Sequence, residues 1–302
     1  KFSKKLNILP INHAFCIKGD FLISFATGST VCINGDMKDL AQNILLFEPT
    51  IINLVPMVAQ GLFTKLEILA QKENKTVAQL RDKVFGSKLT GIYAGGAHLP
   101  EELVHKYKEA KILICQGYGM TECSPTISTP DPSRPDKAYT AGRIAKRCQT
   151  RIVNGELQVK SPSVMMGYCN DPEKTAEVIT EDGWLRTGDL GYVDSENFLH
   201  ITGRIKNLII LGNGENVSPE QLENKLLDHQ LIQECLVHGD ENIITAEIFP
   251  DKTYVNVNMI KDVVAATNHV VNKVNAGVPS YKKIMRVVVR KTPFEKTGTN
   301  KI

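Results

Sequence analysis

The sequence predicts an α/β protein with a mainly parallel sheet over residues 1–140, a small β subdomain over 141–203 and a small α+β domain over 204–302. In the first region short apolar runs alternate with segments of helical spacing, which is typical of a parallel sheet covered by helices. In the second region the apolar runs are short and separated by turns, as in β structure. The third region alternates strand and helix patterns over roughly a hundred residues, enough for an independent unit.

The composition excludes several classes of protein. Of the 302 residues, 42% are hydrophobic and 23% are charged, as in ordinary globular proteins. A net charge of +3 is too small to indicate a nucleic acid partner, and the seven cysteines include no Cys-x-x-Cys pair that would indicate zinc. No apolar run approaches the roughly 18 residues of a membrane span. Membrane association stays open, although no amphipathic anchor supports it. We therefore expect a reduced, cytoplasmic protein.

The elements of the first region follow from local patterns. Apolar runs predict buried strands at 6–10, 51–55, 89–93 and 111–115. Helical spacing predicts helices at 37–47, 57–70 and 100–110, and the last of these begins with acidic residues, as the helix dipole favours. Residues 20–33 are also predicted as strand material, broken at Thr27-Gly28-Ser29.

The later regions carry turn and capping signals. The proline-rich segment 128–135 cannot form regular structure. Asn154-Gly155 predicts a hairpin, within a group of short strands at 150–153, 156–160, 190–194 and 197–202. In the third region Ser218 is predicted to cap a helix at 219–227. The remaining predicted elements are a helix at about 259–275 and strands at 235–238, 243–249 and 284–289.

The stretch 116–123, Gln-Gly-Tyr-Gly-Met-Thr-Glu-Cys, follows a predicted strand and combines an aromatic ring, a hydroxyl and a carboxylate. Tyr118 can stack on a nucleobase, Thr121 can bond a phosphate, and Glu122 can hold Mg²⁺, which prefers oxygen ligands. Gly95-Gly96 follows another predicted strand, and ligands of parallel sheets lie beyond the carboxyl ends of strands. The alternative is a strand end with a polar loop.

Three more residues have side chains that can bind a nucleotide, and each of them can instead have a purely structural role. Asp189 lies between glycines at a predicted strand start, where a carboxylate suits the ribose hydroxyls or simply forms a turn. Arg204 can bond the same sugar or a phosphate, or form a salt bridge at a domain surface. Lys301 lies in the polar segment 293–302, where a lysine can neutralise charge between a carboxylate and a phosphate, or belong to a solvated tail.

Four motifs in order resemble the signatures of the AMP-forming acyl-CoA synthetases, members of the adenylate-forming superfamily. They are Tyr118-Gly-Met-Thr-Glu122, Gly183-Trp-x-x-Thr-Gly-Asp189, Gly203-Arg-x-Lys206 with Gly214-Glu-Asn-Val-x-Pro219, and a closing Lys-Thr-x-Thr-x-Lys-Ile. They span nearly the whole chain, and their shared order argues against coincidence. The resemblance implies that the first two regions are the C-terminal half of a large α/β domain with an appended β subdomain, and that the third is a small mobile C-terminal domain.

The resemblance also implies a role for each nucleotide-site residue. Tyr118 would stack on adenine in a pocket lined by the backbone of Gly95, Gly96 and Ala97. Further implied cofactor-binding residues are Gln116, Gly117 and Gly119. Thr121 would bond the α-phosphate, and Glu122 would hold Mg²⁺. Asp189 and Arg204 would take the ribose hydroxyls, and Lys301 would bridge the acid carboxylate and the α-phosphate.

Three further roles concern the second half of the implied reaction. Lys206 would lie at the hinge of the small domain. Gly212 and Glu215 belong to the loop that would face the site during thioester formation. His13 matches the family position near the acyl and pantetheine tunnel, and a packed histidine at a strand end is the alternative.

The implied reaction uses ATP, Mg²⁺ and CoA. A carboxylic acid, by local resemblance a medium- or long-chain fatty acid, would form acyl-AMP with release of pyrophosphate. The small domain would then rotate about Lys206, and CoA would take the acyl group with release of AMP. A carrier protein in place of CoA, and a non-catalytic nucleotide-binding fragment, are the alternatives. The family's Ser/Thr/Gly-rich phosphate loop is absent from these 302 residues, so we expect little ligase activity from this chain by itself.

Overall fold

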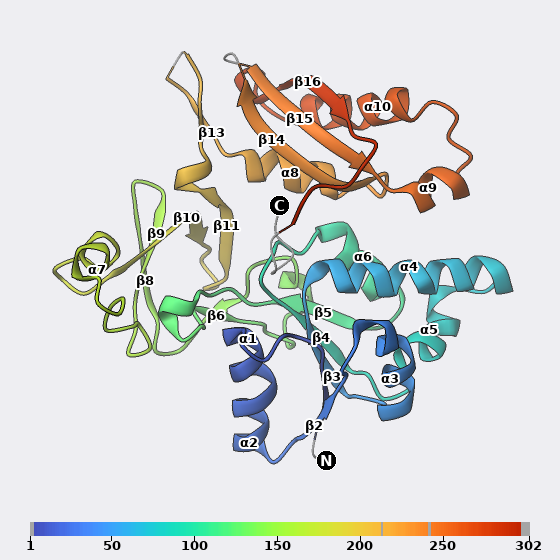
Figure 1. Cartoon of the computed structure of the whole chain (residues 1–302), viewed down its shortest axis with the longest axis horizontal. Coiled ribbons are helices and arrows are strands. Elements are labelled where there is room, and N and C mark those ends of the chain that lie inside the picture. The colour runs from blue at the N-terminus through green and yellow to red at the C-terminus, as the bar shows by residue number, and fades with distance from the viewer. Residues whose placement is uncertain (1–2, 213, 241–242, 297–302) are drawn as a thin grey trace. The chain divides into compact units, whose positions relative to one another are not determined.

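The computed structural model describes residues 3–212, 214–240 and 243–296, and the chain divides into two compact units. The first unit comprises Lys1–Thr187 and Gly191–Ile201, and the second comprises Gly188–Leu190 and Thr202–Ile302. Figure 1 labels the elements of both units. Within the described ranges, no helix combines the length and apolarity that crossing a bilayer requires.

A five-stranded parallel sheet forms the centre of the first unit, which confirms the predicted α/β fold. The strand order is β2-β1-β3-β4-β5, and every neighbouring pair is parallel. The strands are β1 (Lys4–Asn7), β2 (Thr30–Ile33), β3 (Ile51–Leu54), β4 (Gly91–Ala94) and β5 (Leu113–Gln116).

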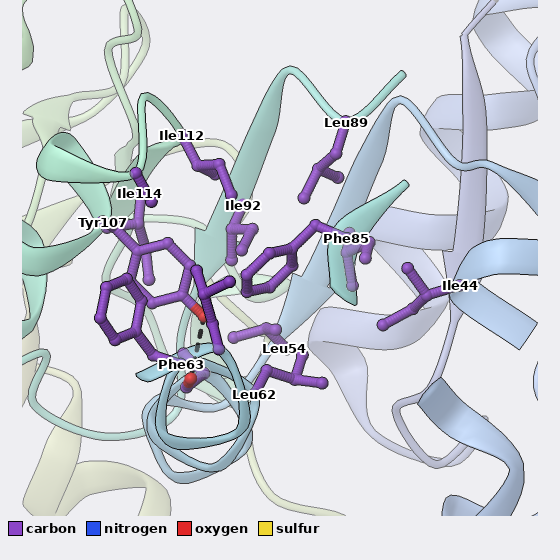
Figure 2. Close-up of a cluster of buried hydrophobic side chains, with 14 of the residues drawn as sticks. Ile44, Leu54, Leu62, Phe63, Phe85, Leu89, Ile92, Tyr107, Ile112 and Ile114 are labelled. Atoms are coloured by element: carbon purple, nitrogen blue, oxygen red, sulfur yellow. Dashed lines mark hydrogen bonds between the residues drawn. The ribbon is translucent and has the colours of Figure 1, made fainter. Parts of the chain in front are cut away.

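Four helices share one hydrophobic core with one face of this sheet. They are α3 (Leu40–Phe47), α4 (Pro56–Glu73), α5 (Val77–Phe85) and α6 (Glu101–Glu109). Tyr107 lies at the centre of this core, with its ring centroid 4.9 Å from that of Phe63 and 5.6 Å from that of Phe85 (Figure 2). Its hydroxyl donates a hydrogen bond of 2.8 Å to the carbonyl of Ala59, so this buried polar atom is satisfied.

Residues 14–27 are helical, so the prediction of a strand beginning at residue 20 is wrong, although β2 does form. The segment consists of α1 (Ala14–Cys16), the π-helical stretch η1 (Ile17–Leu22) and α2 (Ile23–Thr27). Its buried residues are Cys16, Gly19, Asp20 and Ser24, which share one helical face, whereas Phe25 is 74% exposed. The buried positions with helical spacing are therefore occupied by small and polar residues, and a pattern of apolar residues does not reveal the helix.

This helical segment is joined to the sheet by buried polar groups. Asp20 is fully buried and accepts hydrogen bonds from the Asn7 amide at 2.8 Å and from the Asn53 amide at 2.6 Å. Side chains alternate along a strand, so Asn7 points away from the core that contains Leu6. Burial raises the pKa of Asp20, and the two amide hydrogen bonds and the charge of Lys5 oppose that shift.

The β subdomain contains a four-stranded sheet of order β11-β10-β9-β8. Its strands are β8 (Gln149–Val153), β9 (Glu156–Lys160), β10 (Leu185–Val193) and β11 (Leu199–Arg204). Asn154 and Gly155 have φ values of 53° and 83° and close the antiparallel β8–β9 pair, which confirms the predicted hairpin. Asp189 lies inside β10 rather than at a strand start, and helix α7 (Pro172–Val178) was not predicted.

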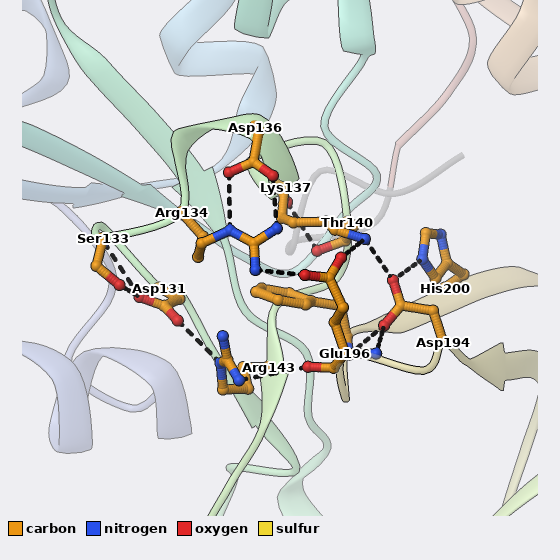
Figure 3. Close-up of polar contacts among 11 residues, drawn as sticks. Asp131, Ser133, Arg134, Asp136, Lys137, Thr140, Arg143, Asp194, Glu196 and His200 are labelled. Atoms are coloured by element: carbon orange, nitrogen blue, oxygen red, sulfur yellow. Dashed lines mark hydrogen bonds and ion pairs between the residues drawn. The ribbon is translucent and has the colours of Figure 1, made fainter.

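A network of charged side chains connects the proline-rich segment with the turn before β11, all within the first unit (Figure 3). The Phe198 ring is buried, and the charged groups of Arg134, Lys137 and Arg143 lie 5.5, 5.5 and 4.6 Å from its centroid. Arg134 and Lys137 also form ion pairs of 2.7 Å each with Glu196. We call Phe198 and these three cations the Phe198 clamp.

The second unit has a separate core around a three-stranded sheet of order β14-β15-β16. The strands are β14 (Ile232–Asp240), β15 (Ile243–Pro250) and β16 (Ile284–Val289). The other elements are the short strands β12 (Ile209–Ile210) and β13 (Asn216–Val217) and the helices α8 (Pro219–Leu227), α9 (Lys252–Val257) and α10 (Val263–Ala276). Helices α8 and α10 contact each other and the sheet, which gives the predicted α+β arrangement.

Ser218 occupies the predicted N-cap position of α8, but its side chain does not cap the helix. Helix α8 begins after Ser218, but the Ser218 hydroxyl does not accept a hydrogen bond from the helix. It donates instead to the carbonyl of Thr202 at 2.8 Å. The side chain thereby ties the start of α8 to the end of β11, a contact between segments that local sequence does not reveal.

Candidate active site

The two glycine-containing loops leave the same edge of the parallel sheet. Strands β4 and β5 are adjacent and parallel, with Ala94 opposite Gln116, so the residues after them emerge side by side. The Gln116 side chain is buried, and its carbonyl accepts a hydrogen bond of 3.0 Å from the Leu99 backbone. Gln116 therefore connects the loop at 95–99 with the stretch that begins at 116.

Two glycines in these loops are required by geometry. Gly96 has a φ of 81°, which side chains rarely adopt. A Cβ atom at Gly119 would lie 1.6 Å from the carbonyl oxygen of Pro125, so only glycine fits there. The backbone between Tyr118 and Thr121 is thus folded tightly against the following segment.

The backbone of Tyr118 is held from three directions. Its N–H donates to the Ser128 hydroxyl at 3.0 Å, and its carbonyl accepts from the Ile127 and Ser128 backbone at 3.1 and 2.9 Å. The ring is partly exposed and packs against the core of the β subdomain. A fixed backbone gives the ring a defined direction, which suits stacking on a planar ligand.

Thr121 and Glu122 lie in the single 3₁₀ turn η3 (Thr121–Cys123). Thr121 is exposed at this turn. The Glu122 carboxylate accepts a hydrogen bond of 2.8 Å from the Tyr168 hydroxyl, and the Glu122 carbonyl accepts one of 2.8 Å from the Met165 backbone. The hydrogen bond to Glu122 raises the pKa of Tyr168, so the phenol stays protonated as a donor.

Tyr168 is a site residue that the sequence did not reveal. It lies 46 positions after Glu122, beyond the proline-rich segment and the β8–β9 hairpin. No motif or spacing links the two positions, and only the folded chain brings them together. Phe15 is a second such residue, because its ring lies against Gly95, where a Cβ atom would approach to 3.1 Å.

His13 caps the helical segment 14–27. Its Nδ1 accepts a hydrogen bond of 3.2 Å from the Phe15 backbone, and the side chain is exposed rather than packed. His13 therefore precedes, by two residues, the ring that contacts Gly95.

Asp189 and Arg204 come together in the second unit. The Arg204 Nε lies 2.8 Å from the Asp189 Oδ1. The Asp189 side chain is 7% exposed, whereas that of Arg204 is 46% exposed. The ion pair holds a buried carboxylate beside an accessible guanidinium, and both groups can bond vicinal hydroxyls.

The other predicted residues of the second unit lie in turns. Lys206 is exposed in η5 (Ile205–Asn207). Gly212 and Glu215 lie between the paired strands β12 and β13, where the Glu215 carbonyl accepts a hydrogen bond of 3.0 Å from Leu211. Lys301 lies outside the described residues.

The residues present suit a magnesium ion that is coordinated by one carboxylate together with a substrate phosphate, and not by protein side chains alone. In the described ranges no three His, Cys, Asp or Glu side chains are grouped so that they could hold a metal ion. Mg²⁺ is typically bound through one or two carboxylates together with substrate phosphates. Glu122, an oriented carboxylate next to the exposed Thr121 hydroxyl, supplies such a donor set.

Models of known protein families match residues in both units. The model of the AMP-binding enzyme family matches residues 3–169, and that of the AMP-binding enzyme C-terminal domain matches residues 206–302. A long-chain-fatty-acid–CoA ligase of Mycobacterium bovis is 30% identical over 277 residues, which cover 80% of this chain and 46% of that protein. A 2-succinylbenzoate–CoA ligase of Bacillus cytotoxicus is 38% identical over 187 residues, which cover 58% of this chain and 38% of that protein.

Solved structures resemble the chain over almost its entire length. The o-succinylbenzoate CoA synthetase of Bacillus subtilis, in complex with its acyl-adenylate intermediate, has a TM-score of 0.77 at 27% identity and covers 99% of this chain and 59% of its own. The adenylation domain of a carboxylate reductase from Mycobacterium chelonae has a TM-score of 0.81 at 21% identity and shares the fold. The chain spans about half the length of the curated relatives it matches. By its sequence motifs, its fold and the family match over residues 3–169, the chain belongs to the AMP-binding enzymes, the adenylate-forming superfamily of the AMP-forming acyl-CoA synthetases.

Proposed function

We propose that the protein activates a carboxylic acid with ATP as acyl-AMP and transfers the acyl group to CoA. The observation that carries this proposal is the shared sheet edge at which β4 and β5 present Gly95–Ala97 and the Tyr118–Glu122 turn. Solved relatives of the same fold are described with an acyl-adenylate and with ATP and magnesium ion. Those ligands belong to the relatives and support the same chemistry here.

Each candidate-site residue of the first unit would contribute one interaction with the nucleotide. The 95–97 backbone and the Tyr118 ring would hold the adenine, and the Thr121 hydroxyl would donate to the α-phosphate. Glu122, oriented by Tyr168, would hold Mg²⁺, which would offset charge on the phosphate oxygens.

The second unit would bind the sugar and complete both half-reactions. The Asp189 carboxylate would accept from the ribose hydroxyls, and Arg204, already paired with it, would hold its orientation. Lys301 would neutralise charge as the acid carboxylate attacks the α-phosphate and pyrophosphate leaves. Rotation about Lys206 would then replace Lys301 by the loop that contains Gly212 and Glu215, because two sets of groups cannot occupy one cleft together.

We propose a medium- or long-chain fatty acid as the acid substrate. The curated relatives include fatty-acid, succinylbenzoate and coumarate ligases, so acid selectivity is the property to measure.

Binding of non-hydrolysable acyl-sulfamoyl adenosines to the 302-residue chain tests the proposal by calorimetry. We expect fatty-acyl analogues to bind more tightly than AMP and more tightly than succinylbenzoyl or coumaroyl analogues. Asp189→Ala should weaken binding of every analogue, and the exposed Tyr139→Phe should leave it unchanged. Absence of AMP and analogue binding would contradict adenylation, and a preference for an aryl analogue would contradict the fatty acid.

A further inference from the structure

A short segment of the second unit lies against the face of its sheet that is turned away from the core. Residues 290–296 follow β16, which is dark red in Figure 1, and we call them the strap. Cys235 and Val237 of β14 belong to the core of this unit. Side chains alternate along a strand, so Glu234 of β14 points to the opposite face, where it meets the strap.

The first residue of the strap is attached to β15. The Arg290 N–H donates a hydrogen bond of 2.7 Å to the Ile248 carbonyl, and the guanidinium forms an ion pair of 2.5 Å with the Glu247 carboxylate. The guanidinium also lies 4.2 Å from the centroid of the Phe294 ring. These contacts fix the place where the chain leaves the sheet.

The last residues of the strap are attached to Glu234. One oxygen of the Glu234 carboxylate accepts a hydrogen bond of 2.9 Å from the Phe294 backbone, and the other lies 2.5 Å from the Lys296 amine. The Glu234 side chain is 8% exposed and that of Lys296 is 22% exposed. A buried carboxylate is costly unless its oxygens are paired, so β14 and the strap stabilise each other.

We propose that Glu234 is a positioning residue for the adenylation step. It holds the strap on the sheet and thereby fixes the point from which Lys301 reaches the acid and the α-phosphate. The inference rests on the proposed function, because it takes the charge-neutralising role of Lys301 from there. Glu234 acts through the strap and not by contact with substrate.

Chain length gives the size of the expected effect. Lys301 follows Lys296 by five residues, so the extended chain can carry it about 17 Å from that anchor. Without the Glu234 contacts the nearest anchor is Arg290, eleven residues before Lys301, and the reach grows to about 37 Å. The anchor thus confines the lysine to a volume about tenfold smaller, which raises its local concentration by at most that factor.

Hydrogen exchange tests the anchor without any ligand. Glu234→Ala removes both attachments, and Lys296→Met removes one of them from the strap side without altering the sheet. We expect faster amide exchange in residues 291–296 of both variants and unchanged exchange in β15. The exposed Glu295→Ala, inside the strap, is the matched control and should exchange like the parent. Unchanged exchange of the strap in both variants would overturn the anchor.

Affinity for a fatty-acyl sulfamoyl adenosine tests the positioning of Lys301. Lys301→Ala should weaken binding of this analogue. Glu234→Ala and Lys296→Met should each weaken it by up to roughly tenfold. In the Lys301→Ala background the same two substitutions should cause no further loss, and Glu295→Ala should leave the affinity of the parent unchanged.

The outcomes separate this inference from the proposed function. Equal losses with and without Lys301 would show that Glu234 supports the fold alone, and an unchanged affinity of Lys301→Ala would leave no group to position; either result would refute the positioning. A parent chain that bound no analogue would contradict the proposed function, and the exchange experiment would still decide whether Glu234 anchors the strap.

Discussion

At the scale of single residues, the site depends on side chains that fix the direction of others. The Tyr168 hydroxyl holds the Glu122 carboxylate, and the Ser128 hydroxyl holds the backbone of Tyr118. Such contacts contribute about 1 kcal/mol each where solvent reaches them. Their importance lies in the orientation that they give to groups that would touch the nucleotide.

We predict that Tyr168→Phe weakens magnesium-dependent AMP binding by roughly threefold to tenfold, because loss of one hydrogen bond to a charged group costs about 1 kcal/mol. AMP titrations with and without Mg²⁺ measure the effect. Binding without Mg²⁺ should change little, since the Tyr118 side of the pocket is intact. The exposed Tyr139→Phe is the matched control. Equal losses with and without Mg²⁺ would show that Tyr168 supports the fold and not the carboxylate.

Glu223 makes the stability of the second unit depend on pH. Burial raises its pKa from 4.5 to about 7, although its carboxylate accepts a hydrogen bond of 2.8 Å from the Val237 backbone. The folded state therefore binds the proton more tightly than the unfolded state. This contribution to stability is fully present below pH 4.5 and is lost as the pH rises through about 7.

We predict that Glu223→Gln removes this dependence. Between pH 5 and pH 8 the parent should lose about 2 kcal/mol of unfolding free energy relative to the variant. Urea unfolding at several pH values measures the difference, with the exposed Glu295→Gln as control. Parallel pH profiles for parent and Glu223→Gln would contradict the assignment.

At the scale of elements, buried polar and charged groups connect segments that lie far apart in the sequence. Asp20 joins the helical segment 14–27 to β1 and β3. The Phe198 clamp connects the proline-rich segment to the turn before β11. Both sets of contacts lie within the first unit.

We predict that Phe198→Leu destabilises the first unit by about 1–3 kcal/mol, through a smaller buried side chain and the loss of three cation–π contacts. Hydrogen exchange should accelerate most in residues 131–143, which the clamp holds. The 74% exposed Phe25 offers a matched Phe25→Leu control that should change neither quantity. Faster exchange spread evenly over the first unit would contradict a local role for the clamp.

At the scale of the whole molecule, the chain has two compact units with separate cores. Phe63 belongs to the core of the parallel sheet, and Ile248 belongs to the core around β14 and β15. Their separate packing predicts that damage to one core leaves the other unit folded.

Calorimetry can test this independence. Phe63→Ala should lower the unfolding temperature of the first unit, and Ile248→Ala that of the second, since each truncation of a buried side chain costs about 2–5 kcal/mol. Hydrogen exchange resolved by residue assigns each transition to its unit. A single transition that both substitutions shift equally would show that the units unfold together.

The sequence by itself determined the elements whose signals are local. Alternation of apolar runs with helical spacing predicted the parallel sheet, and Asn154-Gly155 predicted a hairpin because both positions need positive φ. The ordered motifs around Tyr118 and Asp189 predicted the family. These signals extend over a few residues, where backbone preference and hydrophobic period act directly.

Only the tertiary structure decided the features that depend on distant partners. The helix at 14–27 has a small and polar buried face, so its period becomes visible only where Asp20 meets Asn7 and Asn53. The Tyr168–Glu122 and Asn53–Asp20 hydrogen bonds join positions 46 and 33 residues apart. The local sequence does not reveal such pairs. Their stabilising free energy comes from groups that meet only after the strands and turns between them have folded.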